Sequence, residues 1–262
     1  MMPPTSIDGT DITGATIDGT DVQEITVDGD VVFTAETLPV AYSNLVAWYP
    51  FDSAEYGGSN ADDVTAILGG SGDDTAYDGN NTGASYDSTG GVTDIRAGAN
   101  SGAYDFAGTS TGIELPVTLT TGQTTWSITL WWDTPSYDSR EPLISAGRSG
   151  DTTGNHCNVD SGDFDFVNVG FGERLEFNGM SAGSHHMAVV SGNGSTELYI
   201  DKIQRDTEPV NFTLDDGIDP FYIGQQSSTT NRTFSGNIDD VRFYNKKLSA
   251  TEVTNIYDNT QP

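Results

Sequence analysis

The feature that most constrains the fold of this chain is a strand-like run of seven residues with alternating character. One set of positions holds Trp126, Ile128, Leu130 and Trp132, and the other holds Ser127, Thr129 and Trp131. Successive side chains of a β-strand point to opposite faces. We therefore expect the first set to face a hydrophobic core and the second set, including Trp131, to face the other way.

Similar short apolar runs recur between turns rich in Gly, Asp, Ser, Thr and Asn. They lie at residues 187–190, 197–200, 220–224 and 238–244. This pattern predicts an all-β sandwich of two antiparallel sheets, and the Gly-rich stretch between the first two runs predicts a hairpin. The segment from Asn60 to Ser101 has few apolar residues, so we expect a long loop region there.

A single short helix is expected near the C-terminus, over Leu248–Asp258. Ser249 can cap this helix, and Glu252 follows three residues later, which is the spacing of a capping box. Val253, Ile256 and Tyr257 then share one face, which we expect to pack against the sandwich.

Residues 1–38 differ from the rest because they are repetitive. The sequence IDGTDI at residues 7–12 recurs as IDGTDV at 17–22 and, more loosely, as VDGDVV at 27–32. Each Asp-Gly favours a two-residue hairpin turn, since both central positions of a type I′ turn need positive φ. Such short hairpins bury little apolar surface. We expect a small β module that docks on a partner subunit or on the main domain, residues 39–262; a flexible arm is the alternative.

The charge of the chain excludes several partners. It has 39 Asp and Glu against 10 Lys and Arg, a formal net charge of −29. Such a surface repels phosphate backbones, so nucleic-acid binding is not expected. Membrane insertion is not expected either, because no apolar run approaches the roughly 18 residues that a transmembrane helix needs. The acid excess is typical of proteins from high-salt cytoplasms, and an ordinary acidic extracellular β protein is the alternative.

Several motifs in order resemble one family. Residues 45–52 (LVAWYPFD), 184–189 (SHHMAV) and 198–202 (LYIDK) are similar to its strands, and the strongest match is 234–249, FSGNIDDVRFYNKKLS. This last stretch resembles the pattern F-x-G-x-I-D-D-V-R-x-Y-N-x-x-L-S of the laminin-G-like, concanavalin A-like domains of the lectin/glucanase superfamily. The resemblance implies a two-sheet jelly roll with a short C-terminal helix over residues 39–262.

Catalysis is not expected. Glycosidases of the resembling superfamily carry an E-x-D-x-E strand motif, which is absent here. Glu173 and Glu176 fall on opposite faces of a strand; Asp163 and Asp165 share a face, but a solvated acidic surface explains them. The pair His185-His186 matches a position that is mostly structural in the family. Cys157, beside His156, lacks the rest of a catalytic triad and, as the sole cysteine, excludes an intrachain disulfide.

The resemblance also implies a structural Ca²⁺ ion, held by oxygen ligands at the edge of the sandwich. Its candidate ligands are Asp78 and Asn80, in a loop similar to the family's D-x-x-G-N-x-x-G, together with Asp239 and Asp240. Ala107 stands where the family usually has an Asp, which removes one possible ligand. An acidic loop that binds nothing specific is the alternative.

Two aromatic residues are candidates for ligand binding. Trp131 and Tyr137 could stack on sugar rings if their faces are exposed. The alternative is that both pack inside the sandwich.

Three functions compete. The first is a non-enzymatic surface or structural protein of a virion, from a virus of halophilic archaea. Its jelly roll would serve host-surface or glycan recognition, or decorate a capsid or tail, while residues 1–38 contact other virion proteins and form a homo-oligomer. The chain starts without a signal peptide, and lysis would release such a protein in the virion. The second is a carbohydrate-binding or adhesion domain of an extracellular or cell-surface protein. The third is a jelly-roll glycosidase or lyase.

Overall fold

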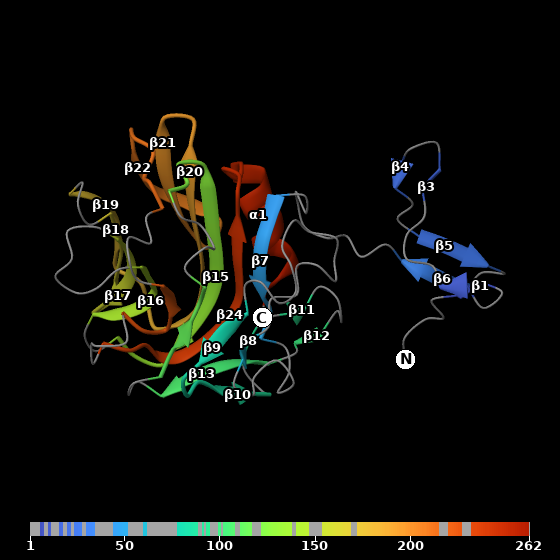
Figure 1. The fold of residues 1–262 in the computed structure, drawn as a ribbon, viewed down its shortest axis with the longest axis horizontal. Helices are drawn as coiled ribbons and strands as arrows, with labels where there is room; N and C mark the ends of the chain where they lie inside the picture. Colours follow the sequence, from blue (N-terminus) through green and yellow to red (C-terminus); the bar gives the residue numbers. More distant parts are fainter. Residues whose placement is uncertain are drawn as a thin grey trace. The chain divides into compact units, whose positions relative to one another are not determined.

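The computed structural model describes a chain in two compact units, Met1–Pro39 and Val40–Pro262 (Figure 1). The described residues are 6–7, 10–11, 16–17, 20–21, 24–27, 30–34, 44–51, 60–61, 78–88, 91, 93–94, 99–100, 102–107, 111–116, 122–137, 140–146, 154–168, 172–214, 220–226 and 232–261. Among them, no helix has the length and hydropathy needed to cross a membrane.

The larger unit contains two eight-stranded antiparallel sheets. Sheet I has the order β10-β13-β24-β15-β20-β21-β22, and β7 also pairs with β24. Its strands are β7 (Leu45–Tyr49), β10 (Ser85–Asp87), β13 (Ala103–Ala107), β15 (Trp126–Thr134), β20 (Gly183–Gly192), β21 (Ser195–Ile200), β22 (Ile203–Glu208) and β24 (Ser235–Tyr244).

Sheet II has the order β19-β18-β17-β16-β23-β14-β9-β8. Its strands are β8 (Asn60–Ala61), β9 (Gly79–Asn81), β14 (Ile113–Glu114), β16 (Glu141–Ala146), β17 (Asn155–Asp160), β18 (Asp163–Asn168), β19 (Glu173–Asn178) and β23 (Phe221–Ile223). A separate two-stranded sheet pairs β11 (Thr93–Asp94) with β12 (Ala99–Asn100). The expected sandwich of two antiparallel sheets is confirmed.

The main core lies between the two sheets. The strand β15 of sheet I turns toward it the alternate residues that the sequence predicts. The core-facing residues of β15 are Trp126, Ile128, Leu130 and Trp132. Their partners from sheet II include Phe164 and Phe166, whose rings lie 6.1 Å from Trp132 and 5.7 Å from Trp126. Trp131 points the other way, as the alternation predicts.

The helix α1 (Ala250–Asn259) covers the other face of sheet I (Figure 1). The capping box expected at its start is present: the Ser249 side chain accepts from the Glu252 backbone N–H, and Glu252 accepts from the Ser249 N–H. A second, smaller core fills the space beneath it, made of Leu45, Trp48, Ala188, Val190, Tyr199, Tyr244, Leu248, Val253 and Ile256. The strands of sheet I that contribute to both cores, such as β15 and β24, are therefore buried over most of their length.

The region from Asn60 to Ser101 differs from the expected long loop. Its described part contains β8 to β12, and β10 and β8 lie at the outer ends of sheets I and II. The sequence pattern misses these strands because edge strands can be short and polar, with few side chains to bury. The pairing partners, such as Tyr104 opposite Tyr86, come from distant parts of the chain.

The described residues of the smaller unit form three hairpins. They pair β1 (Ser6–Ile7) with β2 (Thr10–Asp11), β3 (Thr16–Ile17) with β4 (Thr20–Asp21), and β5 (Glu24–Val27) with β6 (Asp30–Thr34). The innermost pairs are Ile7 with Thr10, Ile17 with Thr20 and Val27 with Asp30. In each hairpin two positions of the sequence separate the innermost pair, and the predicted Asp-Gly turns at these positions lie outside the described residues.

Candidate functional site

A pocket lies on sheet I, where β15 is flanked by β20 and β24. About 220 Å³ of space lies among its lining residues, a figure that includes space open to solvent. Its described lining is Gly91, Trp131, Trp132, Asp133, Ser184, Asn237 and Asp239. In the strand register, Asp133 pairs with both Ser184 and Asn237, and Trp131 pairs with Asp239. Since paired residues project from the same face, these side chains form two adjacent rows across three strands.

Hydrogen bonds fix the polar groups of this lining. Ser184 Oγ donates to Asp133 Oδ1 at 2.9 Å, and Asn237 Nδ2 donates to Asp87 Oδ2 at 3.2 Å. Asp239 Oδ1 accepts from the backbone N–H of Asp240 at 2.8 Å. Asp133 Oδ2 and the Asn237 side-chain oxygen make no hydrogen bond within the described part of the chain. They are acceptors that a ligand hydroxyl or ammonium can use.

A β-bulge in β24 places Asp239 in this row. Arg242 pairs with Thr129, but Asp239 pairs with Trp131, so two residues of β24 stand opposite one residue of β15. Asp240 takes the left-handed conformation there, with φ of 52°. Without the extra residue, the alternation would turn Asp239 toward the main core. The bulge therefore brings its carboxylate to the pocket.

The two aromatic candidates for ligand binding differ in position. Trp131 is 3% exposed, its Nε1 donates to Thr260 Oγ1 at 2.8 Å, and its ring stacks on Tyr257 of α1 at 5.2 Å. It forms part of the pocket wall and has no open ring face for stacking. Tyr137 is half-buried against the main core and is not among the described pocket residues. Burial raises the pKa of its phenol.

The four candidate metal ligands lie in different sheets. Asp78 directly precedes β9, which contains Asn80, in sheet II, whereas Asp239 and Asp240 belong to β24 in sheet I. No group of three or more His, Cys, Asp or Glu side chains in the described ranges is arranged to hold a metal ion. The structure brings Asp239 together with Trp131 in the pocket, whereas Asp78 and Asn80 are not among the described lining residues.

Asp240 belongs to a buried ion pair. Its Oδ1 accepts from Arg242 Nε at 2.8 Å and from Trp48 Nε1 at 2.7 Å. The side chains of Asp240 and Arg242 are 5% and 2% exposed, and the guanidinium lies 4.5 Å from the centre of the Trp48 ring. This arrangement gives Asp240 a structural role that needs no cation.

The neighbouring histidines have opposite environments. His185 Nδ1 lies 2.8 Å from Asp201 Oδ2, and this hydrogen bond raises the pKa of His185 despite its partial burial. His186 is fully buried beside Trp131, and neither ring nitrogen has a hydrogen-bond partner in the described structure. Burial, with a contribution from the Arg242 charge, lowers the pKa of His186 to about 3. Neither residue lines the pocket.

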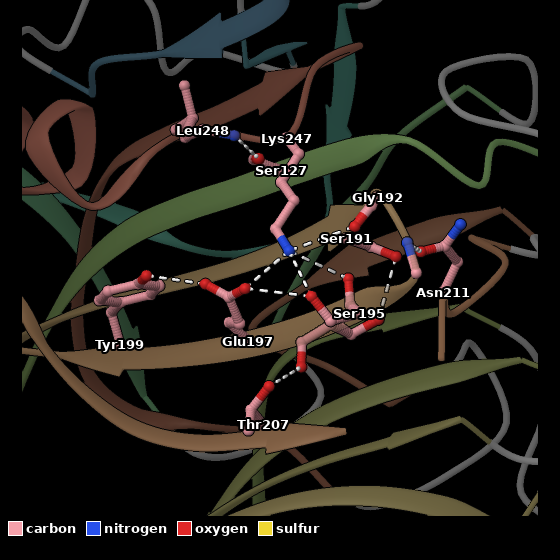
Figure 2. A network of polar contacts seen from close by, with 12 residues as sticks. Ser127, Ser191, Gly192, Ser195, Glu197, Tyr199, Thr207, Asn211, Lys247 and Leu248 are labelled. Atoms are coloured by element: carbon pink, nitrogen blue, oxygen red, sulfur yellow. Dashed lines mark hydrogen bonds and ion pairs between the residues drawn. The ribbon is translucent and has the colours of Figure 1, made fainter. Parts of the chain in front are cut away.

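A polar network joins the hairpin β20–β21 to the segment before α1 (Figure 2). Lys247 Nζ lies 2.7 Å from both Ser195 Oγ and Glu197 Oε1, and Tyr199 donates to the other Glu197 oxygen. A lysine beside a serine can serve as a base in acyl transfer only when its amine is neutral. Here Lys247 Nζ is bound to Glu197, to Ser195 and to the Gly192 carbonyl, so its hydrogen-bonding capacity is used within the protein. The network therefore holds the segment before α1 against the hairpin β20–β21.

Sheet II carries a further carboxylate cluster that the sequence does not single out as a network. Asp165 is 6% exposed; its Oδ2 accepts from Arg140 at 3.1 Å and from Arg174 at 2.9 Å, and its Oδ1 accepts from Asn158 at 2.7 Å. Because all these partners come from sheet II or its border, the cluster cross-links neighbouring strands. Its carboxylate is occupied by protein donors.

Comparison with known proteins defines the family. No curated protein sequence matches the chain. A family profile described as "Concanavalin A-like lectin/glucanases superfamily" matches residues 107–254, which is more than half of the chain. The chain belongs to this superfamily. The matched region of the concanavalin A-like domain includes all of β15, β20 and β24, and with them every described pocket residue except Gly91.

Solved structures share the concanavalin A-like fold at low sequence identity. Domain 4 of AbnA, a GH43 extracellular arabinanase from Geobacillus stearothermophilus in complex with arabinotriose, has 19% identity and a TM-score of 0.59, and the match covers 82% of this chain and 98% of that domain. A mutant Trypanosoma rangeli sialidase has 17% identity, 83% and 33% coverage and a TM-score of 0.57. A Ruminococcus gnavus CBM40 bound to α2,3-sialyllactose has 18% identity, 59% and 96% coverage and a TM-score of 0.51. This chain thus spans only a third of the sialidase.

Proposed function

We propose that this protein is a non-enzymatic glycan-recognition protein, and that the pocket on sheet I is its sugar-binding site. The observation that carries the proposal is the lining of the pocket. A carboxylate at Asp133, an amide at Asn237 and a hydroxyl at Ser184 stand in one row beside Trp131. Sites that bind small polar ligands combine such a few convergent polar groups with an apolar wall.

The neighbours in fold support this proposal. The arabinanase domain was solved with arabinotriose and the CBM40 with sialyllactose, so this fold is able to hold sugars. The fold alone does not specify a ligand, because one fold hosts many functions. The polar row of the pocket is therefore the basis of the assignment.

Direct binding to a glycan panel tests the proposal. We expect the full chain to bind a subset of glycans, and Asn237→Ala or Ser184→Ala to weaken that binding about tenfold, as loss of a hydrogen bond to a buried polar group does. Glu176→Ala, on sheet II, is the matched control and should leave affinity unchanged. Absence of binding to every glycan, or equal loss in the control, would contradict the proposal.

Absence of catalysis is the second part of the proposal. Asp163 and Asp165 lie on one face of a strand and so come nearest to the paired carboxyl groups of a glycosidase. The carboxylate of Asp165, however, accepts hydrogen bonds from Arg140 and Arg174. A general acid and a nucleophile would each need a carboxyl group that faces the substrate. Incubation with the glycans that bind should release no reducing ends; release that Asp133→Asn abolishes would make the protein a hydrolase.

We further propose that the protein works on the surface of a virion, in a virus of halophilic archaea. The three Asp-Gly hairpins then form the part that docks on other virion proteins or on further copies of this chain. Mass spectrometry of purified virions should find the protein there. Its presence in the cell envelope and absence from virions would favour the alternative, an extracellular or cell-surface adhesion domain. A structural Ca²⁺ ion also remains a proposal, with Asp78 and Asn80 in sheet II or Asp239 and Asp240 in sheet I as its candidate ligands.

A further inference from the structure

The charge of the pocket lining indicates which class of sugar it can take. Its described residues include two carboxylates, those of Asp133 and Asp239, and no Lys, Arg or His. Asp133 is paired only with the neutral hydroxyl of Ser184 within the described structure. A ligand beside Asp133 therefore meets a negative charge, and the described lining supplies no Lys, Arg or His to offset it.

The described basic residues are engaged elsewhere. Four of them pair with acids around α1: Lys202 with Asp258, Lys246 with Glu252, Lys247 with Glu197 and Arg242 with Asp240. Arg140 and Arg174 bind Asp165 on sheet II, Arg205 lies over the ring of Phe177 on β19, and Arg232 donates to Gln226 Oε1. The charge of Asp133 contributes to the raised pKa of His185, but the imidazole of His185 is hydrogen-bonded to Asp201. None of these side chains lines the pocket.

We propose that the pocket selects amino sugars over neutral sugars and excludes sugars that carry a carboxylate or sulfate group. The inference rests on the proposed function and deepens it by naming the ligand class. A carboxylate makes stronger hydrogen bonds to an ammonium than to a hydroxyl, because the bond is charge-assisted. An anionic substituent at the same place meets like charge, which is costly at hydrogen-bonding distance in a partly enclosed site.

This order of preference differs from what the fold would suggest by analogy. The CBM40 of similar fold was solved with sialyllactose, whose terminal sugar is acidic. The local charge of the pocket in this chain opposes such a ligand. The proposal can therefore be tested directly against the fold analogy.

Matched sugars that differ only in charge provide the test. The full chain is titrated in a chelator-containing buffer with methyl glycosides of glucosamine, N-acetylglucosamine, glucose and glucuronate, and with the same set in the galacto series. We expect the amino sugar to bind about tenfold more tightly than the two neutral sugars, and the uronate not to bind. The preference should shrink in 3 M KCl, because salt screens charges that are open to solvent.

Asp133→Asn is the decisive variant, since it removes the charge and retains the shape. It should reduce the preference for the amino sugar to near unity and change neutral-sugar affinity less than about threefold. Glu176→Gln, an exposed acid on sheet II, is the control and should retain the preference. Equal or tighter binding of the uronate, or an unchanged preference in Asp133→Asn, overturns the inference while sugar binding stands. Failure of every sugar in both series overturns the proposed pocket function and this inference with it.

Discussion

Asp240 and Arg242 form the most deeply buried ion pair among the described residues. Truncating one partner of such a pair leaves the other charge buried without compensation. We expect Asp240→Ala to lower the free energy of unfolding by about 3–5 kcal/mol. Asp258→Ala removes the partner of Lys202 in an exposed pair and should cost less than about 1 kcal/mol. Urea denaturation of both variants gives the comparison, and equal losses would contradict it.

The contribution of the proposed Ca²⁺ ion to stability can be distinguished from that of the Asp240–Arg242 ion pair by adding a chelator. An ion bound only by the native state adds to stability, so a chelator should lower the melting temperature of the wild type. The loss caused by Asp240→Ala should persist with the chelator, because its origin is Arg242. Asp239→Ala should cost less in the chelator than without it. An unchanged wild-type melting temperature would eliminate the ion.

His185 makes stability depend on pH in a defined direction. The hydrogen bond to Asp201 raises the pKa of His185 above its unfolded value, which is about 6.5. The native state then binds the proton more tightly than the unfolded state does. The contribution of His185 to the free energy of unfolding is therefore fully present below about pH 6.5, and it is lost as the pH rises through the pKa of the folded state. We expect His185→Gln to destabilise the protein more at pH 6 than at pH 9. Denaturation at the two pH values checks it, and a pH-independent loss would contradict the ion pair.

The start of α1 is set by local chemistry, which makes its capping box testable alone. Ser249 accepts from the Glu252 N–H, so Ser249→Ala leaves a helix-end donor unsatisfied and should cost about 1 kcal/mol. Hydrogen exchange should show faster opening of α1 in this variant. Asn255→Ala, at an exposed position of the helix, is the control and should change the exchange little. The same exchange rate in both variants would mean that packing alone defines the helix end.

The elements that could be predicted from sequence are those with local signals. The alternation over 126–132 fixed which side of β15 meets the core, and the spacing of Ser249 and Glu252 located α1. The bulge at Asp240 has no such signal, because it exists only relative to the pairing of β24 with β15. For the same reason the pocket could not be predicted: Asp133, Ser184 and Asn237 meet through strand pairing, and Trp131 loses its open face to a helix more than a hundred residues away.

The net charge of −29 should make the stability of the whole molecule rise with salt. The excess acids repel one another at low ionic strength, and molar salt shortens the Debye length to about 3 Å. We expect a higher melting temperature in 3 M KCl than in 0.1 M. An equal or lower value would remove the support for adaptation to high salt.

Assembly should depend on the smaller unit. Its three hairpins are separate two-stranded sheets, which are marginal unless further strands complete them, whereas the larger unit has a core of its own. In molar salt, light scattering should show the full chain as an oligomer and a chain starting at Tyr42 as a folded monomer. The same oligomeric state in both would mean that the hairpins do not drive assembly.

The placement of the lysines has a practical consequence for biosensor work. The chain has only Lys202, Lys246 and Lys247, and each is paired with a carboxylate close to α1. Amine-reactive coupling at these lysines would therefore attach the molecule beside its C-terminal helix. It would also remove the positive charges of Lys202 and Lys246, which pair with Asp258 and Glu252 of that helix. Thr260, at the end of that helix, bonds Trp131 in the pocket wall, so a chip made in this way would alter the site it is meant to measure. Enzymatic biotinylation of a terminal tag leaves these amines intact.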